Sequence, residues 1–136
     1  MTVYLIHGAP ASGKTTEAKR RAKPGDIIID SDLLAEALGS PSSHDHPAHV
    51  KSLAMHLRDV AVAKTAHQAC DVYIVSASPN AVNTIPHDTA ILCDPGMGTC
   101  LARAKMRPKW TTLAVKTWYQ NYDPEQKSKR LRTRKW

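Results

Sequence analysis

Residues 8–15 read Gly8-Ala9-Pro10-Ala11-Ser12-Gly13-Lys14-Thr15, a complete G-x-x-x-x-G-K-S/T pattern. The apolar stretch Val3-Tyr4-Leu5-Ile6 precedes it, and the helix-compatible residues 16–22 follow it. A strand, a glycine-rich loop and a helix in this order form a phosphate-binding loop. Its backbone N–H groups point at phosphate oxygens, and its helix directs the positive end of the dipole at them. This context favours binding of a nucleoside triphosphate over an ordinary glycine turn.

The residue types of the loop suggest which part of the ligand each one meets. The Lys14 ammonium is expected to meet the β- and γ-phosphate oxygens, and the Thr15 hydroxyl is expected to bind Mg²⁺. The sequence therefore predicts ATP and Mg²⁺ as cofactors. The residues predicted to bind the nucleotide are Gly8, Ala11, Ser12, Gly13, Lys14, Thr15 and Thr16.

The chain has 136 residues, enough for one domain with a substantial core but leaving little room for a second catalytic domain. It contains no run of about 18 apolar residues, and its first residues lack the pattern of a signal peptide. We therefore expect a cytoplasmic protein without a membrane span. No C-x-x-C pair is present, which argues against a disulfide framework or a cysteine-based zinc site. The cysteines, interpreted as small core residues, are Cys70, Cys93 and Cys100.

The formal net charge of +7 is concentrated at the C-terminal end of the chain. A basic tail of this density indicates a polyanionic partner, and nucleic acid is the predicted one. A solvated tail that only improves solubility is the alternative. The residues concerned are Lys127, Lys129, Arg130, Arg132, Arg134 and Lys135.

Apolar runs and helix-compatible segments alternate along the chain. Continuous β-branched runs such as Ile27-Ile28-Ile29 are typical of parallel strands covered on both faces. We predict strands at residues 2–7, 27–29, 72–75 and 90–93. The predicted helices reach from the loop to residue 22 and then cover 31–38, 49–69, 99–106 and 111–122. Ser31 is predicted to cap the second helix.

The predicted fold is α/β: a P-loop NTPase of the nucleotide-kinase-like type, a three-layer α/β/α sandwich with a mostly parallel sheet of four or five strands. The kinase domain is expected to span residues 1–122, including a lid-like helix at 97–108, and the basic tail residues 123–136. Right-handed crossovers between parallel strands place the ligand at the carboxyl ends of the strands.

Two carboxylates, in Asp30-Ser31-Asp32, follow the predicted strand at 27–29. The chain has no N-K-x-D element of the kind that GTPases need, and its third predicted strand ends at residues 75–78 without an acid. A carboxylate at the end of the second strand can instead accept the proton of an attacking hydroxyl, and Asp32 is the candidate. The alternative for Asp32 is stabilisation of the helix dipole. Asp30 is a candidate for a catalytic role and equally for a structural or magnesium-associated one.

Arg103 and Arg107 are spaced i, i+4 in the predicted lid-like helix. This spacing places both guanidinium groups on one helical face, where they can close over the triphosphate and stabilise transition-state charge. Surface arginines without such a role are the alternative. The catalytic candidates are thus Lys14, Asp32, Arg103 and Arg107.

This set of motifs resembles the kinase domain of bacteriophage polynucleotide 5′-hydroxyl kinases, and it is similar to small phage-encoded P-loop proteins described as ATPases or kinases. The resemblance covers roughly residues 1–108, and its phosphate loop is the most specific part. It implies that Asp32 orients and deprotonates the acceptor hydroxyl and that Arg103 and Arg107 contact the donor phosphates. That family also has an arginine three residues after the aspartate, where this chain has Ala35. The sequence does not identify a basic residue that replaces it.

Two further groups of residues carry open interpretations. The segment His44-Asp45-His46-Pro47-Ala48-His49 is read either as a metal site that uses His46 and His49 or as an acceptor-site or lid loop. Aromatic residues near Lys109 and Lys116 suit base stacking with single-stranded nucleic acid, or they anchor the last helix. These aromatic residues are Trp110, Trp118, Tyr119, Tyr122 and Trp136, whereas His7 and Tyr73 are interpreted as core residues.

The sequence as a whole predicts an ATP-dependent P-loop kinase that transfers the γ-phosphoryl group to a hydroxyl on nucleic acid. The acceptor is either a 5′-OH end or a hydroxymethylated base of phage DNA. A small-molecule kinase for a nucleoside, nucleotide or sugar is the first alternative, and it predicts that the tail is dispensable for turnover. A nucleic-acid-binding ATPase module without phosphotransfer is the second, and it predicts hydrolysis without a phosphorylated product.

Overall fold

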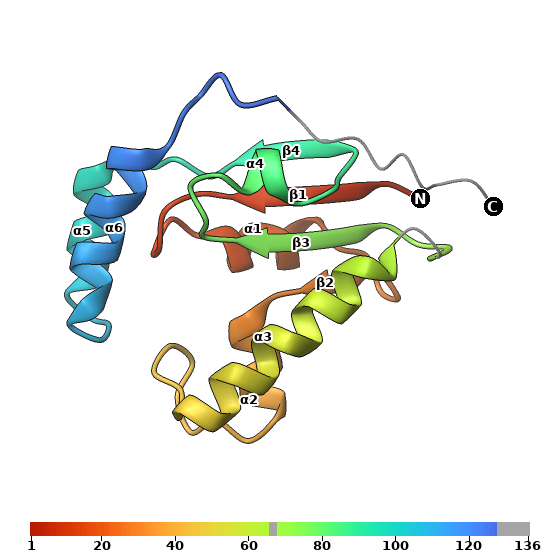
Figure 1. Ribbon diagram of the computed structural model, residues 1–136, viewed down its shortest axis with the longest axis horizontal. Coiled ribbons are helices and arrows are strands. Elements are labelled where there is room, and N and C mark those ends of the chain that lie inside the picture. The colour runs from red at the N-terminus through yellow and green to blue at the C-terminus, as the bar shows by residue number, and fades with distance from the viewer. Residues whose placement is uncertain (66–67, 128–136) are drawn as a thin grey trace.

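The structure, a computed structural model, describes residues 1–65 and 68–127. These residues form a four-stranded sheet and six helices (Figure 1). The strands are β1 (Val3–His7), β2 (Ile27–Ile29), β3 (Val72–Ser76) and β4 (Thr89–Leu92). The helices are α1 (Lys14–Arg21), α2 (Ser31–Ala37), α3 (Ala48–Ala63), α4 (Ala81–Thr84), α5 (Met97–Ala104) and α6 (Trp110–Asn121).

The sheet has the strand order β2-β3-β1-β4, and every pairing in it is parallel. In the register of the central pair, Val3 lies opposite Val72 and His7 lies opposite Ser76. The predicted parallel sheet is therefore confirmed. Because all strands run the same way, the phosphate loop after β1, the carboxylates after β2 and the residues after β3 leave the sheet at one edge.

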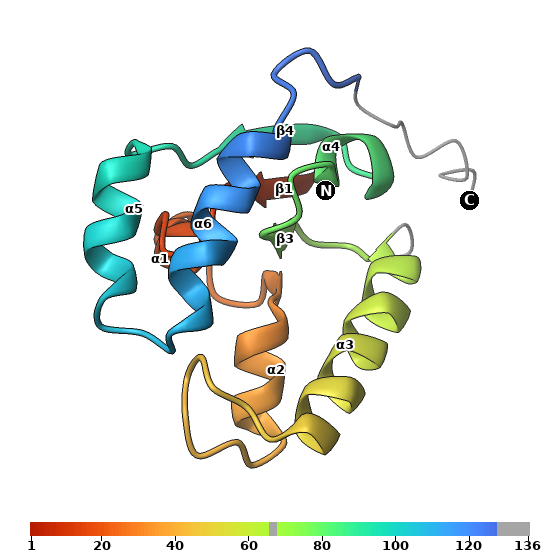
Figure 2. The same ribbon diagram turned by 60° about the vertical axis from the view of Figure 1, so that its left-hand side comes forward.

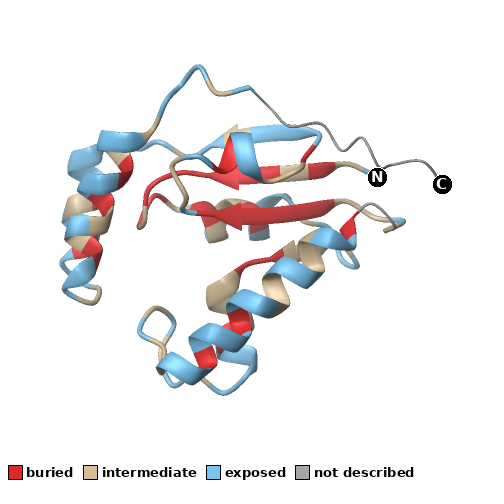
Figure 3. Cartoon of the chain, in the orientation of Figure 1, coloured by how far each residue is buried: buried red, intermediate tan, exposed pale blue. Residues whose placement is uncertain are grey.

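Apolar side chains cover both faces of the sheet, because successive residues of a strand point to opposite sides. One cluster joins the strands to α3 and α4, and the other joins them to α1. Figure 3 shows the resulting burial of β1 and β3 along most of their length. The first cluster contains Val3, Leu5, Ile29, Val72, Ile74, Ala81 and Val82. The second contains Ile6, Ala18, Tyr73 and Val75.

Two helix pairs flank the site end of the sheet: α5 and α6 lie beyond its carboxyl edge, whereas α3 runs along one face of the sheet, with α2 packed against it (Figure 1). Helices α2 and α3 pack together through Ala35, Val50 and Ala54. Helices α5 and α6 pack together and against Ala9 of the phosphate loop, with Trp118 buried and stacked on Tyr122 at 4.4 Å between ring centroids. The interpretation of Trp118 as an anchor of the last helix is thus confirmed. Figure 2 shows the two pairs on different sides of the structure.

Several predicted helix boundaries are wrong. The helix predicted at 49–69 ends at Ala63, where the Thr65 hydroxyl donates a hydrogen bond to the Val62 carbonyl at 2.9 Å. The lid-like helix predicted at 97–108 ends at Ala104, because Pro108 has no N–H to donate to the Ala104 carbonyl, which accepts from the Arg107 N–H instead, at 3.0 Å. The predicted cap Ser31 is also wrong. The N-cap of α2 is Asp30, whose carboxylate accepts hydrogen bonds from the backbone N–H groups of Asp32 and Leu33.

The cysteines pack as expected: Cys100 is buried, while Cys70 and Cys93 are partly buried against the two sheet clusters. Within residues 1–65 and 68–127, no helix is long and apolar enough to cross a membrane. Of the basic tail, Lys127 is described and exposed. The remaining predicted nucleic-acid contacts, and Trp136, lie outside the described residues: Lys129, Arg130, Arg132, Arg134 and Lys135.

Candidate active site

The phosphate loop turns directly from β1 into α1. A Cβ atom at Gly8 would lie 2.4 Å from the backbone oxygen of Cys93, so only glycine allows this approach of the two chain segments. Gly13, the N-cap of α1, has a φ of 94°, in the left-handed region that favours glycine. Ala11 also has a positive φ, of 63°, which is uncommon for a residue with a side chain. The two glycines of the motif are thus required by packing at one end of the loop and by backbone conformation at the other.

Replacing Gly8 with alanine is expected to lower the free energy of unfolding by about 1–3 kcal/mol, the usual cost of forcing extra atoms into a packed site. The matched control is Gly98→Ala in α5, where a Cβ atom meets nothing within 4 Å and the backbone is helical. There the change is expected to be neutral or stabilising, because alanine favours helix over glycine. Thermal unfolding of the two variants tests this, and equal melting temperatures would contradict it.

Lys14 is 8% exposed, and its Nζ donates to the Ala9 carbonyl at 2.6 Å and lies 3.4 Å from Ser12 Oγ. Burial lowers the pKa of the Lys14 ammonium to about 8, and the Arg107 guanidinium also lowers it. A buried cation gains most from an anionic partner. The loop therefore holds Lys14 where a phosphate oxygen would relieve the cost of its burial.

His7, at the end of β1, is 3% exposed. The pKa of His7 is lowered to about 4, mainly by burial and in smaller part by the nearby His87 and Lys14. The imidazole is therefore neutral near pH 7. This confirms the interpretation of His7 as a packed strand residue, and buried Tyr73, stacked on Tyr4, is likewise a core residue.

Asp30 lies beside the phosphate loop although β3 separates β2 from β1 in the sheet. Its Oδ2 accepts a hydrogen bond from the Thr15 hydroxyl, and its Oδ1 accepts the 2.8 Å bond from the Asp32 N–H that caps α2. A hydroxyl and a carboxylate side by side provide oxygen ligands of the kind that Mg²⁺ binds, together with phosphate oxygens and water. The residues present therefore fit the predicted ion. The described residues contain no group of three or more His, Cys, Asp or Glu side chains able to hold a metal on their own.

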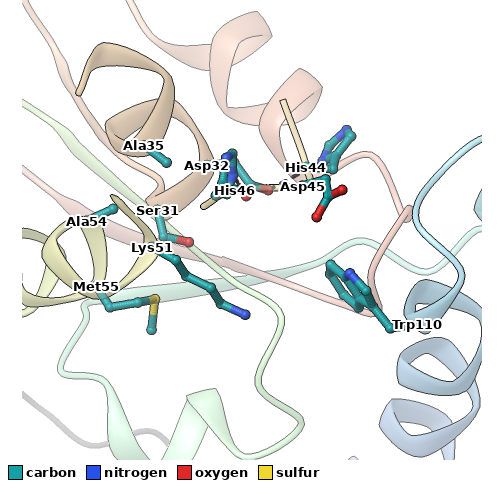
Figure 4. A pocket seen from close by; sticks show the side chains of 10 residues that line it. All are labelled: Ser31, Asp32, Ala35, His44, Asp45, His46, Lys51, Ala54, Met55 and Trp110. Carbon is teal, nitrogen blue, oxygen red and sulfur yellow. Dashed lines mark hydrogen bonds and ion pairs between the residues drawn. The ribbon is translucent and has the colours of Figure 1, made fainter. Parts of the chain in front are cut away.

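Asp32 extends from the first turn of α2 and is held by the loop that precedes α3. Its Oδ1 lies 2.7 Å from His46 Nε2, and its Oδ2 lies 3.5 Å from His44 Nδ1. The side chain of Asp32 is 44% exposed, whereas that of His46 is 5% exposed. Figure 4 shows the three side chains gathered at one end of a small pocket. His44 and His46 of the histidine segment thus lie against Asp32, and His49 is exposed on α3.

The two arginines occupy different positions, because α5 ends between them. Arg103 lies in α5, and its Nη1 donates to the Ala11 carbonyl at 3.2 Å, so that it braces the tip of the phosphate loop. Arg107 lies in the following turn and lines the cleft. Burial lowers the pKa of the Arg107 guanidinium, while the Asp32 carboxylate acts to raise it. The expectation of one shared helical face is therefore wrong, although both side chains are directed at the loop region.

One cleft of about 610 Å³ brings most of the candidate residues together, but Gly8, Ser12 and Arg103 do not line it. This volume is within the range of small-molecule sites. Its walls come from the phosphate loop, the start of α2, the inner face of α3, the end of β3 and the α5–α6 turn. Among the residues that line it are Gly13, Lys14, Thr15, Thr16, Asp30, Asp32 and Arg107.

Sequence reasoning missed the contribution of α3 to this cleft. Lys51, Met55 and Arg58 line it at positions i, i+4 and i+7, which share one face of a helix. Lys51 and Arg58 are seven residues apart, so their spacing in the sequence could have indicated that they share one face of the helix. Lys51 also lies 5.7 Å from the ring centroid of Trp110, so that α3 and α6 meet across the mouth of the cleft.

The structure also explains Ala35. Its side chain is fully buried under Val50 and Ala54 of α3, so an arginine has no room there. Cations come instead from α3, where Lys51 and Arg58 face the cleft. The Arg58 Nε atom is buried and makes no hydrogen bond within the described residues. The Arg58 Nη2 atom lies 3.7 Å from Oδ1 of Asp59, its neighbour on α3.

No protein-family model matches this chain, and a search of curated proteins finds no match. What bears on function is therefore the chemistry of the residues in the cleft.

Proposed function

We propose that this protein is an ATP-dependent kinase that transfers the γ-phosphoryl group to a hydroxyl. One observation carries the proposal: a single cleft holds Lys14 and Thr15 of a complete phosphate loop together with the Asp32 carboxylate and the Arg107 guanidinium. A phosphate-binding group, a candidate base and a further cation around one space are the parts that phosphoryl transfer needs. The catalytic residues in this proposal are Lys14, Asp32, Arg103 and Arg107.

The fold supports this assignment. A parallel sheet with order β2-β3-β1-β4, a phosphate loop after a central strand and helices packed on both faces are what a nucleotide-kinase-like P-loop NTPase requires. In open parallel sheets, ligands bind beyond the carboxyl ends of the strands. The cleft lies at this edge, where Ala77 and Ser78 follow β3 and Asp30 follows β2.

The donor side of the cleft binds and neutralises the triphosphate. Loop N–H groups and the N-terminus of α1 meet the phosphates, and Lys14 exchanges its bond to the Ala9 carbonyl for a phosphate oxygen. Thr15 and Asp30 would hold Mg²⁺, which when bound neutralises charge on the β- and γ-oxygens. Arg103 braces the loop, and Arg107 faces the cleft, where charge develops on the transferred group.

The acceptor side of the cleft activates a hydroxyl. As the hydroxyl oxygen attacks the γ-phosphorus, Asp32 takes its proton, and the bond between the γ-phosphorus and the bridging oxygen breaks. The electron pair of that bond leaves with ADP, whose charge is stabilised by Lys14. The products are ADP and a phosphate ester.

Nucleic acid is the acceptor class that the charge of the chain favours. The net charge of +7 and the basic residues from Lys127 onward suit a polyanion. On α3, Lys51 and Arg58 add positive charge within the cleft itself. A 5′-OH end or a hydroxymethylated base both supply a hydroxyl beside phosphates.

A small-molecule acceptor is the second candidate, and the pocket in Figure 4 favours it. This pocket has a volume of about 90 Å³ and shares Asp32, Lys51 and Trp110 with the cleft. A sugar or nucleoside hydroxyl that enters it would reach Asp32 without a strand of nucleic acid in place.

Incubation with γ-labelled ATP, Mg²⁺ and a panel of acceptors tests the proposal. The panel contains a 5′-hydroxyl oligodeoxynucleotide, duplex DNA with hydroxymethylated cytosine, nucleosides and sugars. We expect label on an oligonucleotide or on hydroxymethylated DNA. Label on a nucleoside or sugar alone would support the second candidate. Release of labelled phosphate with no labelled acceptor would identify an ATPase and contradict both.

Removing the chain from Lys127 onward is expected to weaken oligonucleotide binding and to leave ATP affinity nearly unchanged. On single strands, each neutralised phosphate contributes about −0.7 to the slope of log affinity against log salt concentration. Six basic residues that neutralise phosphates would therefore give a slope of about −4. The truncated protein should show a flatter slope. Titration of a labelled oligonucleotide at several salt concentrations measures the affinity and the slope for the intact and the truncated protein. Identical curves for the two proteins would indicate that the tail serves only solubility.

A further inference from the structure

A chain of hydrogen bonds connects the candidate base to the loop before α3. Ser40 Oγ lies 2.6 Å from His46 Nδ1, and His46 Nε2 lies 2.7 Å from Asp32 Oδ1. The imidazole of His46 is 5% exposed, so that water does not compete freely for either nitrogen. The phosphate loop and the predicted magnesium ligands take no part in this chain.

Hydrogen bonds within the loop before α3 position His46 beside Asp32. Ser42 Oγ accepts hydrogen bonds from the backbone N–H groups of His44 and Asp45, at 3.2 and 3.1 Å, which fixes the turn. Ser40 Oγ is also within hydrogen-bond distance of the Ser42 carbonyl, at 3.1 Å. Ser40 thus holds the His46 ring at Nδ1, while Nε2 contacts Asp32.

The single hydroxyl proton of Ser40 limits the possible proton positions. If Ser40 donates to His46 Nδ1, the neutral ring carries its proton on Nε2 and donates to Asp32. If Ser40 instead donates to the Ser42 carbonyl, it accepts from Nδ1–H, and Nε2 of a neutral ring then has no proton for Asp32. The first arrangement is the one in which Nε2–H points at Asp32 Oδ1.

We infer that His46 is a positioning residue for phosphoryl transfer, which holds Oδ1 of Asp32 so that Oδ2 receives the proton of the acceptor hydroxyl. This inference rests on the proposed function. His44 Nδ1 is 3.5 Å from Oδ2, too far for a good hydrogen bond, so Oδ2 stays accessible. Because Nε2 already carries a proton in the first arrangement, His46 orients the base and does not take the proton itself.

Five variants test the role of His46: His46→Ala, His46→Gln, Asp32→Asn, the double variant Asp32→Asn/His46→Ala, and the control His56→Ala, an exposed histidine of α3. His46→Ala is expected to lower kcat by up to about 10²-fold, the cost of a misplaced reacting group, with KM for ATP unchanged. His46→Gln should restore most of the rate, because its amide N–H₂ can donate to Oδ1. In the Asp32→Asn background, His46→Ala should cost nothing further. His56→Ala should behave as the wild type.

Three kinetic outcomes would overturn the inference while leaving the kinase intact. These are wild-type rates in His46→Ala, a loss that His46→Gln does not restore, and an equal loss in the Asp32→Asn background. The acceptor is the member of the panel above that the wild type phosphorylates, and melting temperatures show that each variant is folded.

A second readout does not depend on activity. Imidazole ¹⁵N–¹H correlation spectra of the wild-type protein, with His46→Gln for assignment, should show His46 protonated at Nε2. A ring protonated only at Nδ1 would overturn the inference. A wild type that phosphorylates no acceptor would refute the proposed function, and these spectra would then still decide whether His46 donates to Asp32.

Discussion

Lys14→Ala is expected to lower kcat for phosphoryl transfer by at least about 10²-fold, the effect of losing one group that stabilises transition-state charge. The Lys14 ammonium is the buried cation of the phosphate loop, and its interaction with the transferred group strengthens as charge develops on the phosphate oxygens. Initial rates at saturating ATP and Mg²⁺ measure the loss. Lys23→Ala, at an exposed lysine outside the cleft, is the control and should keep the wild-type rate.

The fold of Lys14→Ala is expected to remain intact. Because burial lowers the pKa of Lys14 to about 8, the folded state disfavours its charged form at pH 7, and removing the charge removes that cost. Thermal unfolding at pH 7 should therefore show a melting temperature no lower than that of the wild type. Unchanged turnover at saturating ATP would refute the role of Lys14, and a large drop in melting temperature would refute this account of its burial.

Asp32→Asn is expected to retain ATP affinity and to slow transfer by about 10²–10⁴-fold, the usual range for loss of a general base. The amide keeps the shape of the side chain but cannot accept the proton of the hydroxyl. Single-turnover transfer from labelled ATP measures the step, and equilibrium titration with a fluorescent ATP analogue measures binding.

The variant Asp30→Asn distinguishes the role of Asp30 from that of Asp32. Asparagine caps a helix about as well as aspartate, so α2 should persist, while the partner of Thr15 loses its charge. We expect this variant to need more Mg²⁺ for half-maximal rate. A large loss of rate at saturating Mg²⁺ in Asp30→Asn, together with a small loss in Asp32→Asn, would assign the base to Asp30 and contradict the geometry described here.

The parts of the site that depend on local spacing could be predicted from the sequence. The phosphate loop is contiguous, so its residues and the helix after it follow from the pattern of Gly8–Thr15. The position of Asp30 beside the loop required only that β2 join the same parallel sheet, and its bond to Thr15 confirms that it does.

The parts that depend on packing between distant segments could not be predicted in the same way. Lys51 and Arg58 face the cleft because α3 packs over Ala35, a contact that no local pattern specifies. The pairing of His46 with Asp32 spans 14 residues and depends on the turn at Ser42. Arg103 and Arg107 have helical spacing, yet the helix ends between them, because Pro108 has no N–H to donate to the Ala104 carbonyl.

The most direct test of the central claim is the ratio of phosphorylated acceptor to ADP formed by the wild-type protein. If the cleft directs the γ-phosphoryl group to a hydroxyl beside Asp32, each ADP should be matched by about one phosphate ester, and Asp32→Asn should reduce both products together. Chromatography of a reaction with γ-labelled ATP and the acceptor panel measures the two amounts. ADP accompanied by inorganic phosphate alone, at a rate that Asp32→Asn leaves unchanged, would contradict the assignment.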